Sequence, residues 1–184
     1  GDESVQRNQR AHVGASDESS GDKRSIGSAR RASALYRLAM KFGVALLGCG
    51  TVGTGVLRLL ERNREEIFAK RGVQLEVIGV GVRDLSKPRP GVNAPISNDL
   101  QGLVEDPSVH IVIEAMGGVE PAKTLIQAAI RAKKHVVTAN KELMAKHGHE
   151  IRELARENGV DVRMEAAVAA GIPVIGAIER LLGA

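Results

Sequence analysis

The sequence has almost no cysteine and no long apolar run. Its 184 residues include one cysteine, which excludes a disulfide framework and a multi-cysteine zinc site and is typical of a reducing cytosol. No stretch reaches about 18 consecutive apolar residues, so no membrane span is predicted. Hydrophobic residues still make up 43% of the chain, enough to bury a core. We therefore expect a cytoplasmic protein with a folded domain.

The chain also lacks a strong excess of one charge. Its net charge is +4, and half of this excess falls in residues 1–40, which hold seven basic and five acidic side chains. The rest of the sequence is close to neutral, so it offers no extended basic surface of the kind that binds nucleic acid. We expect neither a nucleic-acid nor a membrane partner.

Residues 1–39 lack any sustained hydrophobic period and are predicted to be a disordered extension. Arginine, serine and alanine are frequent there, as in transit peptides, but five acidic residues argue against that interpretation. A patch around Arg30–Arg31 that binds nucleic acid weakly is a further alternative. We favour an extension with no role in the fold, because Met40 directly precedes the first expected strand.

From Phe42 onward, apolar runs alternate with amphipathic repeats. Strands are predicted at 42–47, 73–82, 110–115, 135–138 and 160–167. Helices are predicted at about 52–71, 99–105, 121–132, 142–158 with a break near Gly148, and 172–182, with a loop at 83–98. This alternation predicts an α/β fold with a doubly wound parallel sheet.

The most specific local motif is G-x-G-x-x-G at residues 48–53, directly after the first strand and at the start of a helix. In a dinucleotide-binding turn, Gly48 would allow the tight turn, Gly50 the approach of a pyrophosphate, and Gly53 close packing of helix and strand. The amides of the helix N-terminus would face the phosphates. An incidental glycine turn is the alternative, but the strand and helix on either side favour NAD or NADP binding.

The residues after the second strand leave the choice of dinucleotide open. Arg83 would accommodate the 2′-phosphate of NADP, whereas Asp84 would bind the ribose 2′-hydroxyl of NAD. Arg83 comes first and Lys87 is close by, which favours NADP. The alternative is a solvated pair of loop charges.

Two later loops are predicted at the same edge of the sheet. Met116 and Gly117 follow the third strand, where small residues would let a nicotinamide ribose approach, although a plain turn is the alternative. Lys141 follows the fourth strand and could meet the nicotinamide or an anionic substrate. An ordinary surface lysine is the alternative there. Glu165 begins a run of small residues whose carbonyl groups could turn toward an ion, although such runs also occur in tight packing.

Three blocks together resemble the nucleotide-binding part of the homoserine dehydrogenase family: LLGCGTVGTGV at 46–56, VVTANKELMA at 136–145 and EAAVAAGIPVI at 165–175. The resemblance covers about residues 41–184. It implies a Rossmann-type domain at 40–170, followed at 171–184 by the start of a substrate and dimerisation domain. It also implies a homodimer for the full-length family and the interconversion of L-homoserine and L-aspartate 4-semialdehyde with NAD or NADP, on the route to threonine, methionine and isoleucine.

The resemblance also implies roles for individual residues. The cofactor-binding positions of the family fall on Gly48, Gly50, Thr51, Val52, Gly53, Arg83, Met116, Gly117 and Lys141. Lys141 is in addition the expected catalytic residue beside the nicotinamide and the reacting substrate. A monovalent cation such as sodium would be held by Glu165 and by the backbone oxygens of Val168, Ala170 and Ile172.

One block of the family does not occur in these 184 residues: P-x-x-D-L-x-G-x-D-x-x-x-K. In the family, the aspartate and lysine of this block bind the substrate and transfer its hydroxyl proton. We therefore expect the substrate domain to be largely missing and this chain to be an inactive fragment. Two alternatives stay open. One is a nucleotide-binding module without turnover, and the other is a different small-substrate dehydrogenase, such as aspartate dehydrogenase or dihydrodipicolinate reductase.

Overall fold

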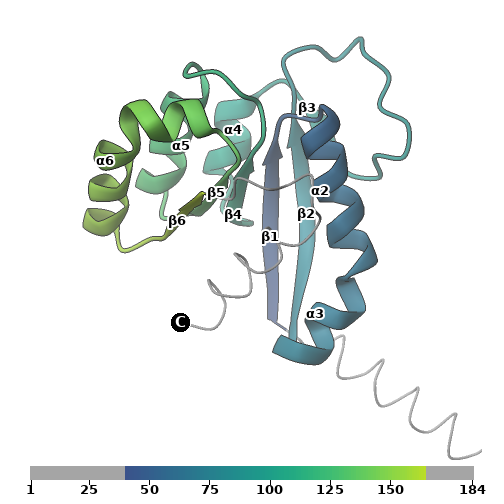
Figure 1. The fold of residues 1–184 in the computed structure, drawn as a ribbon. Helices are drawn as coiled ribbons and strands as arrows, with labels where there is room; N and C mark the ends of the chain where they lie inside the picture. Colours follow the sequence, from purple (N-terminus) through teal and green to yellow (C-terminus); the bar gives the residue numbers. More distant parts are fainter. Residues whose placement is uncertain (1–39, 165–184) are drawn as a thin grey trace, which may run out of the picture. The chain divides into compact units, whose positions relative to one another are not determined.

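A parallel sheet of six strands forms the centre of the computed structural model, which describes residues 40–164 (Figure 1). The strands are β1 (Met40–Leu47), β2 (Val73–Gly81), β3 (Ile96–Ser97), β4 (Val109–Glu114), β5 (His135–Thr138) and β6 (Val162–Met164). They lie in the order β3-β2-β1-β4-β5-β6, so the chain adds β2 and β3 on one side of β1 and then crosses over to add β4, β5 and β6 on the other. Open α/β sheets bind ligands at such a switch point. The predicted doubly wound, Rossmann-type sheet is confirmed.

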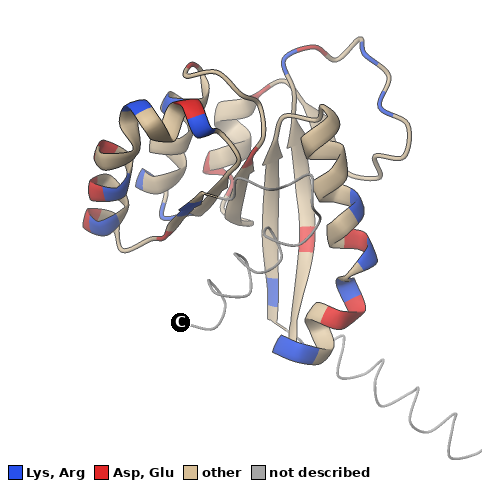
Figure 2. Cartoon of the chain, viewed as in Figure 1, with Lys and Arg blue, Asp and Glu red and all other residues tan. Residues whose placement is uncertain are grey.

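Helices cover both faces of the sheet. They are α2 (Thr51–Arg62), α3 (Arg64–Arg71), α4 (Leu100–Glu105), α5 (Ala122–Arg131) and α6 (Lys141–Asn158). Figure 1 shows α4, α5 and α6 on one side and α2 with α3 on the other. Most charged side chains lie on helices and loops, whereas the strands carry few of them (Figure 2).

The core consists of two apolar layers that share the central strand. Ala45 and Leu47 of β1 pack toward α4, α5 and α6, and Val44 and Leu46 pack in the layer that contains α2. All four side chains are fully buried. A strand that is apolar on both sides, rather than alternating, is what a sheet covered on both faces requires.

Asn63 divides the predicted helix at 52–71 into α2 and α3. Its side-chain amide donates to the carbonyl oxygen of Leu59 (2.8 Å), and its backbone leaves the helical region at ψ 8°. Asn63 thus ends α2 and begins α3, a local change that the hydrophobic period does not reveal. The predicted end at Gly72 is observed, with Gly72 in the left-handed conformation (φ 68°).

The predicted break near Gly148 is wrong, because α6 runs through Gly148 without interruption. One interior glycine costs a helix about 1 kcal/mol. The burial of Leu143, Met144, Ile151 and Ala155 on the core side of α6 outweighs that cost.

Two smaller differences concern strands. The loop predicted at 83–98 contains β3, whose Ile96 and Ser97 pair with Val80 and Gly81. The strand predicted at 160–167 is seen as β6, and its last three predicted residues lie outside the described range. The extension predicted at 1–39, the predicted cation site and the second-domain segment at 171–184 also lie outside it. Within residues 40–164, no helix has the length and apolar composition that a membrane span needs.

Candidate functional site

Three loops that carry the predicted residues begin at one edge of the sheet. The amide of Gly48, after β1, donates to the carbonyl oxygen of Gly81 at the end of β2 (2.8 Å). The amide of Ala115, after β4, donates to Leu47 at the end of β1 (2.8 Å), and that of Ala139 donates to Glu114 (3.0 Å). The ends of four neighbouring strands are therefore joined at the carboxyl edge of the sheet.

Gly48 and Gly53 hold the turn between β1 and α2 in a compact form. Gly48 has φ 94°, which side chains rarely tolerate, and a Cβ there would lie 2.8 Å from the backbone of Ala115. A Cβ on Gly53 would lie 2.0 Å from the carbonyl oxygen of Gly48. The start of the helix thus packs directly against the turn, which only glycine permits.

Gly50 differs from these two glycines, because among residues 40–164, its chain neighbours aside, no atom lies within 4 Å of where its Cβ would be. It is the exposed N-cap of α2, and it has no side chain with which to cap the helix amides. The first turn holds no acidic residue, and Thr51 and Val52 are exposed. This open helix N-terminus can take an anion such as a pyrophosphate.

Arg83 and Asp84 follow β2 and differ in what they contact. Among residues 40–164, no hydrogen bond or ion pair engages the exposed Arg83 side chain. The Asp84 carboxylate instead accepts bonds from the hydroxyl (2.6 Å) and amide (2.9 Å) of Ser86, with Lys87 at 3.9 Å. The Ser86 hydroxyl, then its amide, and more weakly Lys87 and Arg89 hold the pKa of Asp84 below its ordinary value.

The loop after β4 is held by a buried carboxylate. Glu114 is fully buried, and its Oε1 accepts bonds from the amides of Met116 (2.8 Å) and Gly117 (3.2 Å). Gly117 and Gly118 both have φ above 70°, so the loop makes a sharp turn with its amides directed inward. Its outer surface at Gly117 is open: apart from the chain neighbours, no atom of the described residues lies within 4 Å of where a Cβ would be.

The loop after β5 is tied to the same carboxylate. The Thr138 hydroxyl donates to Oε2 of Glu114 (2.5 Å) and accepts from the amide of Asn140 (3.0 Å). The Asn140 side chain donates to the carbonyl oxygen of Gly118 (2.6 Å) and accepts from the amide of Leu143, which caps α6. Lys141 begins α6 and is exposed, and no described residue forms a hydrogen bond or ion pair with its side chain.

The position of Lys141 bears on its function. A cation at a helix N-terminus lies at the end of the dipole that disfavours positive charge, so Lys141 does not serve the stability of α6. It lies one residue from Asn140, whose side chain contacts the β4–α5 loop. Its amine is therefore available to a ligand at this edge of the sheet.

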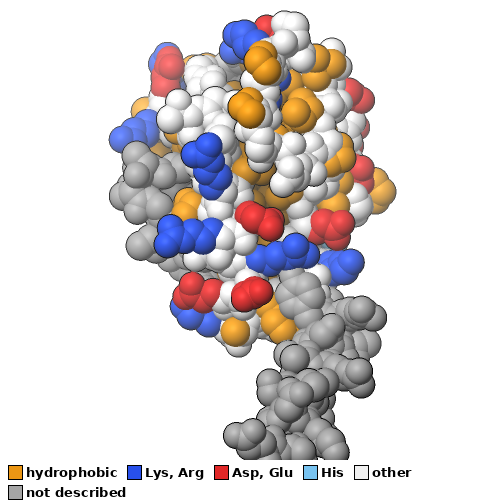
Figure 3. All heavy atoms as spheres, turned by 90° about the vertical axis from the view of Figure 1, so that its right-hand side faces the viewer, with side chains coloured by type: hydrophobic (Ala, Val, Ile, Leu, Met, Phe, Trp, Pro, Cys, Tyr) orange, Lys and Arg blue, Asp and Glu red, His pale blue; other side chains and the backbone are white. Residues whose placement is uncertain are grey.

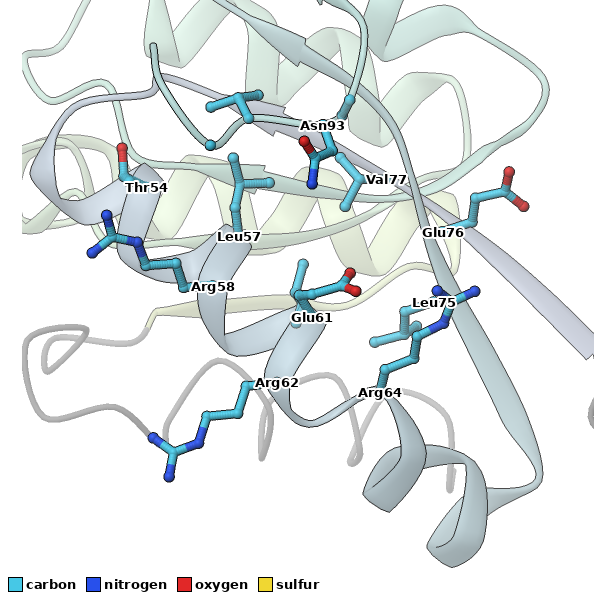
Figure 4. A pocket seen from close by; sticks show the side chains of 14 residues that line it. Thr54, Leu57, Arg58, Glu61, Arg62, Arg64, Leu75, Glu76, Val77 and Asn93 are labelled. Carbon is cyan, nitrogen blue, oxygen red and sulfur yellow. The ribbon is translucent and has the colours of Figure 1, made fainter.

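A separate groove of about 430 Å³ lies between α2, β2 and residues 91–94 (Figure 4). Leu57, Leu75 and Val77 supply apolar lining, and Arg58 and Arg62 extend from α2. None of the nine predicted cofactor residues, all of which lie within residues 40–164, lines this groove. On this side of the molecule basic and acidic side chains lie next to one another, so no surface of single charge forms (Figure 3).

The predicted cation site falls outside the described residues, because it consists of Glu165, Val168, Ala170 and Ile172. Within residues 40–164, no group of three or more His, Cys, Asp or Glu side chains is placed to hold a metal ion.

Comparison with known proteins identifies the family of this chain. Residues 48–165 match the family model described as homoserine dehydrogenase, NAD binding domain. The chain belongs to this family. The match begins at Gly48 and includes all nine residues that we predicted at the cofactor.

Individual relatives agree with the family. The chain is 46% identical over 149 residues to a homoserine dehydrogenase of Synechocystis, covering 78% of this chain and 33% of that protein. It is 47% identical over 142 residues to that of Corynebacterium glutamicum, covering 76% and 32%. The crystal structure of a homoserine dehydrogenase from Thiobacillus denitrificans superposes with a TM-score of 0.69 at 46% identity, over 76% of this chain and 33% of that one. The chain thus spans about a third of the length of these relatives.

Sequence reasoning missed Glu114 and the hydroxyl of Thr138. Both lie at the ends of strands that are otherwise apolar, β4 and β5. An acidic residue that closes a buried strand is unusual, since such a side chain is rarely buried without partners. That signal could have identified Glu114, although not its partners.

Proposed function

We propose that this chain is the NADP-binding part of an enzyme that interconverts L-homoserine and L-aspartate 4-semialdehyde. The observation that carries the proposal is the turn at residues 48–53, whose open helix N-terminus lies at the switch point of the sheet. Homoserine dehydrogenase family membership supports the substrate pair. The proposal extends to the cytoplasmic synthesis of threonine, methionine and isoleucine and to a homodimer of the whole enzyme, on the resemblance to the family.

The residues present fit a dinucleotide. Gly50 leaves room for a pyrophosphate over the amides of Thr51 and Val52. The Met116–Gly117 turn offers an open surface for the nicotinamide ribose. Lys141 would lie at the nicotinamide end of the same edge.

The preference for NADP over NAD is supported by the loop after β2. Asp84 is the residue that would favour NAD, and its carboxylate is already bound by Ser86. The Arg83 guanidinium has no partner among the described residues, so it can take a 2′-phosphate.

A bound nicotinamide would supply the hydride acceptor for oxidation of the substrate alcohol, whose hydroxyl proton would leave to a base. We assign Lys141 to the reacting oxygen, where its amine donates a hydrogen bond that favours the carbonyl product. We also propose that Glu165 and the backbone oxygens of Val168, Ala170 and Ile172 hold a monovalent cation such as sodium, on the resemblance alone.

Calorimetry tests the binding part of this proposal. The chain should bind NADP⁺ and 2′,5′-ADP, and NAD⁺ more weakly. No binding of any of the three would refute the proposal. A second assay, reduction of NADP⁺ with L-homoserine, then separates turnover from binding. Binding without turnover would identify the chain as a nucleotide-binding module.

A further inference from the structure

Glu114 is a buried carboxylate that contacts two loops at once. Its side chain is fully buried, and it makes no ion pair with any residue of the described range 40–164. Burying a carboxylate without a cation is costly unless several donors bind it. Three donors do so here: the amides of Met116 and Gly117 on Oε1 and the hydroxyl of Thr138 on Oε2.

Glu114 is the acceptor in each of these bonds. The Thr138 hydroxyl accepts from the amide of Asn140, so its own proton points to Glu114. Both backbone amides can only donate. Glu114 thus joins the β4–α5 loop, which binds Oε1, to the end of β5, which binds Oε2.

Two further bonds close the connection between the loops. The Asn140 amide group donates to the carbonyl oxygen of Gly118, and the amide of Ala139 donates to the backbone oxygen of Glu114. The β4–α5 loop and the start of α6 are thus fixed to each other across the sheet edge. Lys141 directly follows the last residue of this network.

We propose that Glu114 is a positioning residue that sets the β4–α5 loop and the start of α6 in one arrangement around the nicotinamide half of the cofactor. It does so through Thr138 and without touching the cofactor. This inference rests on the proposed function. It adds that the two loops form one unit, and that the adenosine half, bound at residues 48–53 and Arg83, is independent of it.

The test compares a ligand that occupies both halves of the site with one that occupies the adenosine half alone. NADP⁺ spans the site, whereas 2′,5′-ADP reaches only the adenosine half. In the unmodified chain, NADP⁺ should bind more tightly than 2′,5′-ADP. Thr138→Val keeps the side-chain volume but removes the donor to Glu114. It should weaken NADP⁺ binding roughly tenfold, because a buried hydrogen bond to Glu114 is lost, and leave 2′,5′-ADP binding unchanged.

Two further variants, one control and one second test, accompany Thr138→Val. Thr138→Ser keeps the hydroxyl and should restore NADP⁺ binding to within about twofold of the unmodified chain. Glu114→Gln keeps the size of the side chain but has only one accepting oxygen, so it should lower NADP⁺ binding in the same selective way. Unchanged binding of 2′,5′-ADP shows in each case that the variant has folded.

Three results would overturn the inference. The first is an equal loss of affinity for both ligands in Thr138→Val, which would indicate a general structural role. The second is no loss of either ligand. The third is equal affinity of the unmodified chain for NADP⁺ and 2′,5′-ADP, which would mean that the nicotinamide half of the cofactor contributes nothing to binding. Failure of the proposed function itself is distinct, because the unmodified chain would then bind neither ligand.

Discussion

The Cβ position of Gly53 lies 2.0 Å from the carbonyl oxygen of Gly48, so the first turn of α2 packs backbone to backbone on the end of β1. No side-chain movement could relieve a contact made by backbone atoms. Gly50, three residues earlier, has open space around it. The same loop therefore contains glycines with two separate tasks, one for the fold and one for the ligand.

We predict that Gly53→Ala destabilises the domain and that Gly50→Val does not. The alanine forces a backbone shift that costs about 1–3 kcal/mol, which should lower the melting temperature by several degrees. Gly50 has φ −86° and ψ −157°, an extended conformation that valine adopts freely. Its side chain would instead occupy the path of the pyrophosphate and abolish NADP⁺ binding.

Melting curves and calorimetry on each variant check this pair. Gly55→Val serves as the control, because it adds the same side chain to α2 at a position with open space and away from the loop. It should leave both stability and affinity nearly unchanged. Normal NADP⁺ affinity in Gly50→Val would show that this helix N-terminus is not the phosphate site.

Arg83→Ala should change the choice of cofactor. Loss of a charge-assisted bond to the 2′-phosphate costs about 1.5–3 kcal/mol, so NADP⁺ affinity should fall roughly ten- to a hundredfold while NAD⁺ affinity is nearly constant. Arg71→Ala, at the opposite end of β2, controls for the loss of one positive charge. Equal losses of affinity for both cofactors would show that Arg83 does not contact the 2′-phosphate.

Local sequence patterns predicted the parts of this structure that depend on neighbouring residues. The run Phe42–Leu47 with the glycines after it predicted β1 and the turn, because burial on both faces and glycine spacing are visible in the chain itself. The cap at Gly72 was predicted for the same reason. The break at Asn63 was not, since it depends on one side-chain hydrogen bond to Leu59.

Contacts between distant residues could not be predicted in this way. The Thr138 hydroxyl meets Glu114 across 24 positions of sequence, and only the pairing of β4 with β5 brings them together. The engagement of Asp84 by Ser86 is local in sequence but depends on the conformation of the loop. The sequence therefore left the choice between NAD and NADP open, and the engagement of Asp84 by Ser86 supports our proposal of NADP.

Glu150 should contribute stability that is lost in acid. Its carboxylate accepts bonds from Lys123 (3.0 Å) and Gln127 (2.6 Å) of α5, with His147 at 3.4 Å. The bond from Lys123 is the main reason that the pKa of Glu150 lies below its ordinary value of 4.5, with its charge, Gln127 and His147 adding to the effect. A lowered pKa in the folded state means that the contribution is complete above pH 4.5 and disappears as the pH falls through the folded pKa.

The contribution of Glu150 can be measured by comparing the melting temperatures of Glu150→Gln and the unmodified chain between pH 7 and pH 3. The variant should melt lower at pH 6–7, and the two curves should converge below about pH 4.5. Lys123→Met should show the same convergence, because it removes the largest cause of the shift. A difference that persists unchanged to pH 3 would show that Glu150 does not act through its charge.

Gly148→Ala tests whether α6 is continuous. Gly148 is buried within the helix, and a Cβ there would meet only the ends of flexible side chains: Nη1 of Arg152 at 3.3 Å and Cε of Met144 at 3.4 Å. Both can move by a few tenths of an ångström. Because alanine favours a helix interior by about 1 kcal/mol over glycine, the variant should melt a few degrees higher. A break at this position, as the sequence pattern predicted, would instead need the freedom of glycine, and alanine would then lower the melting temperature.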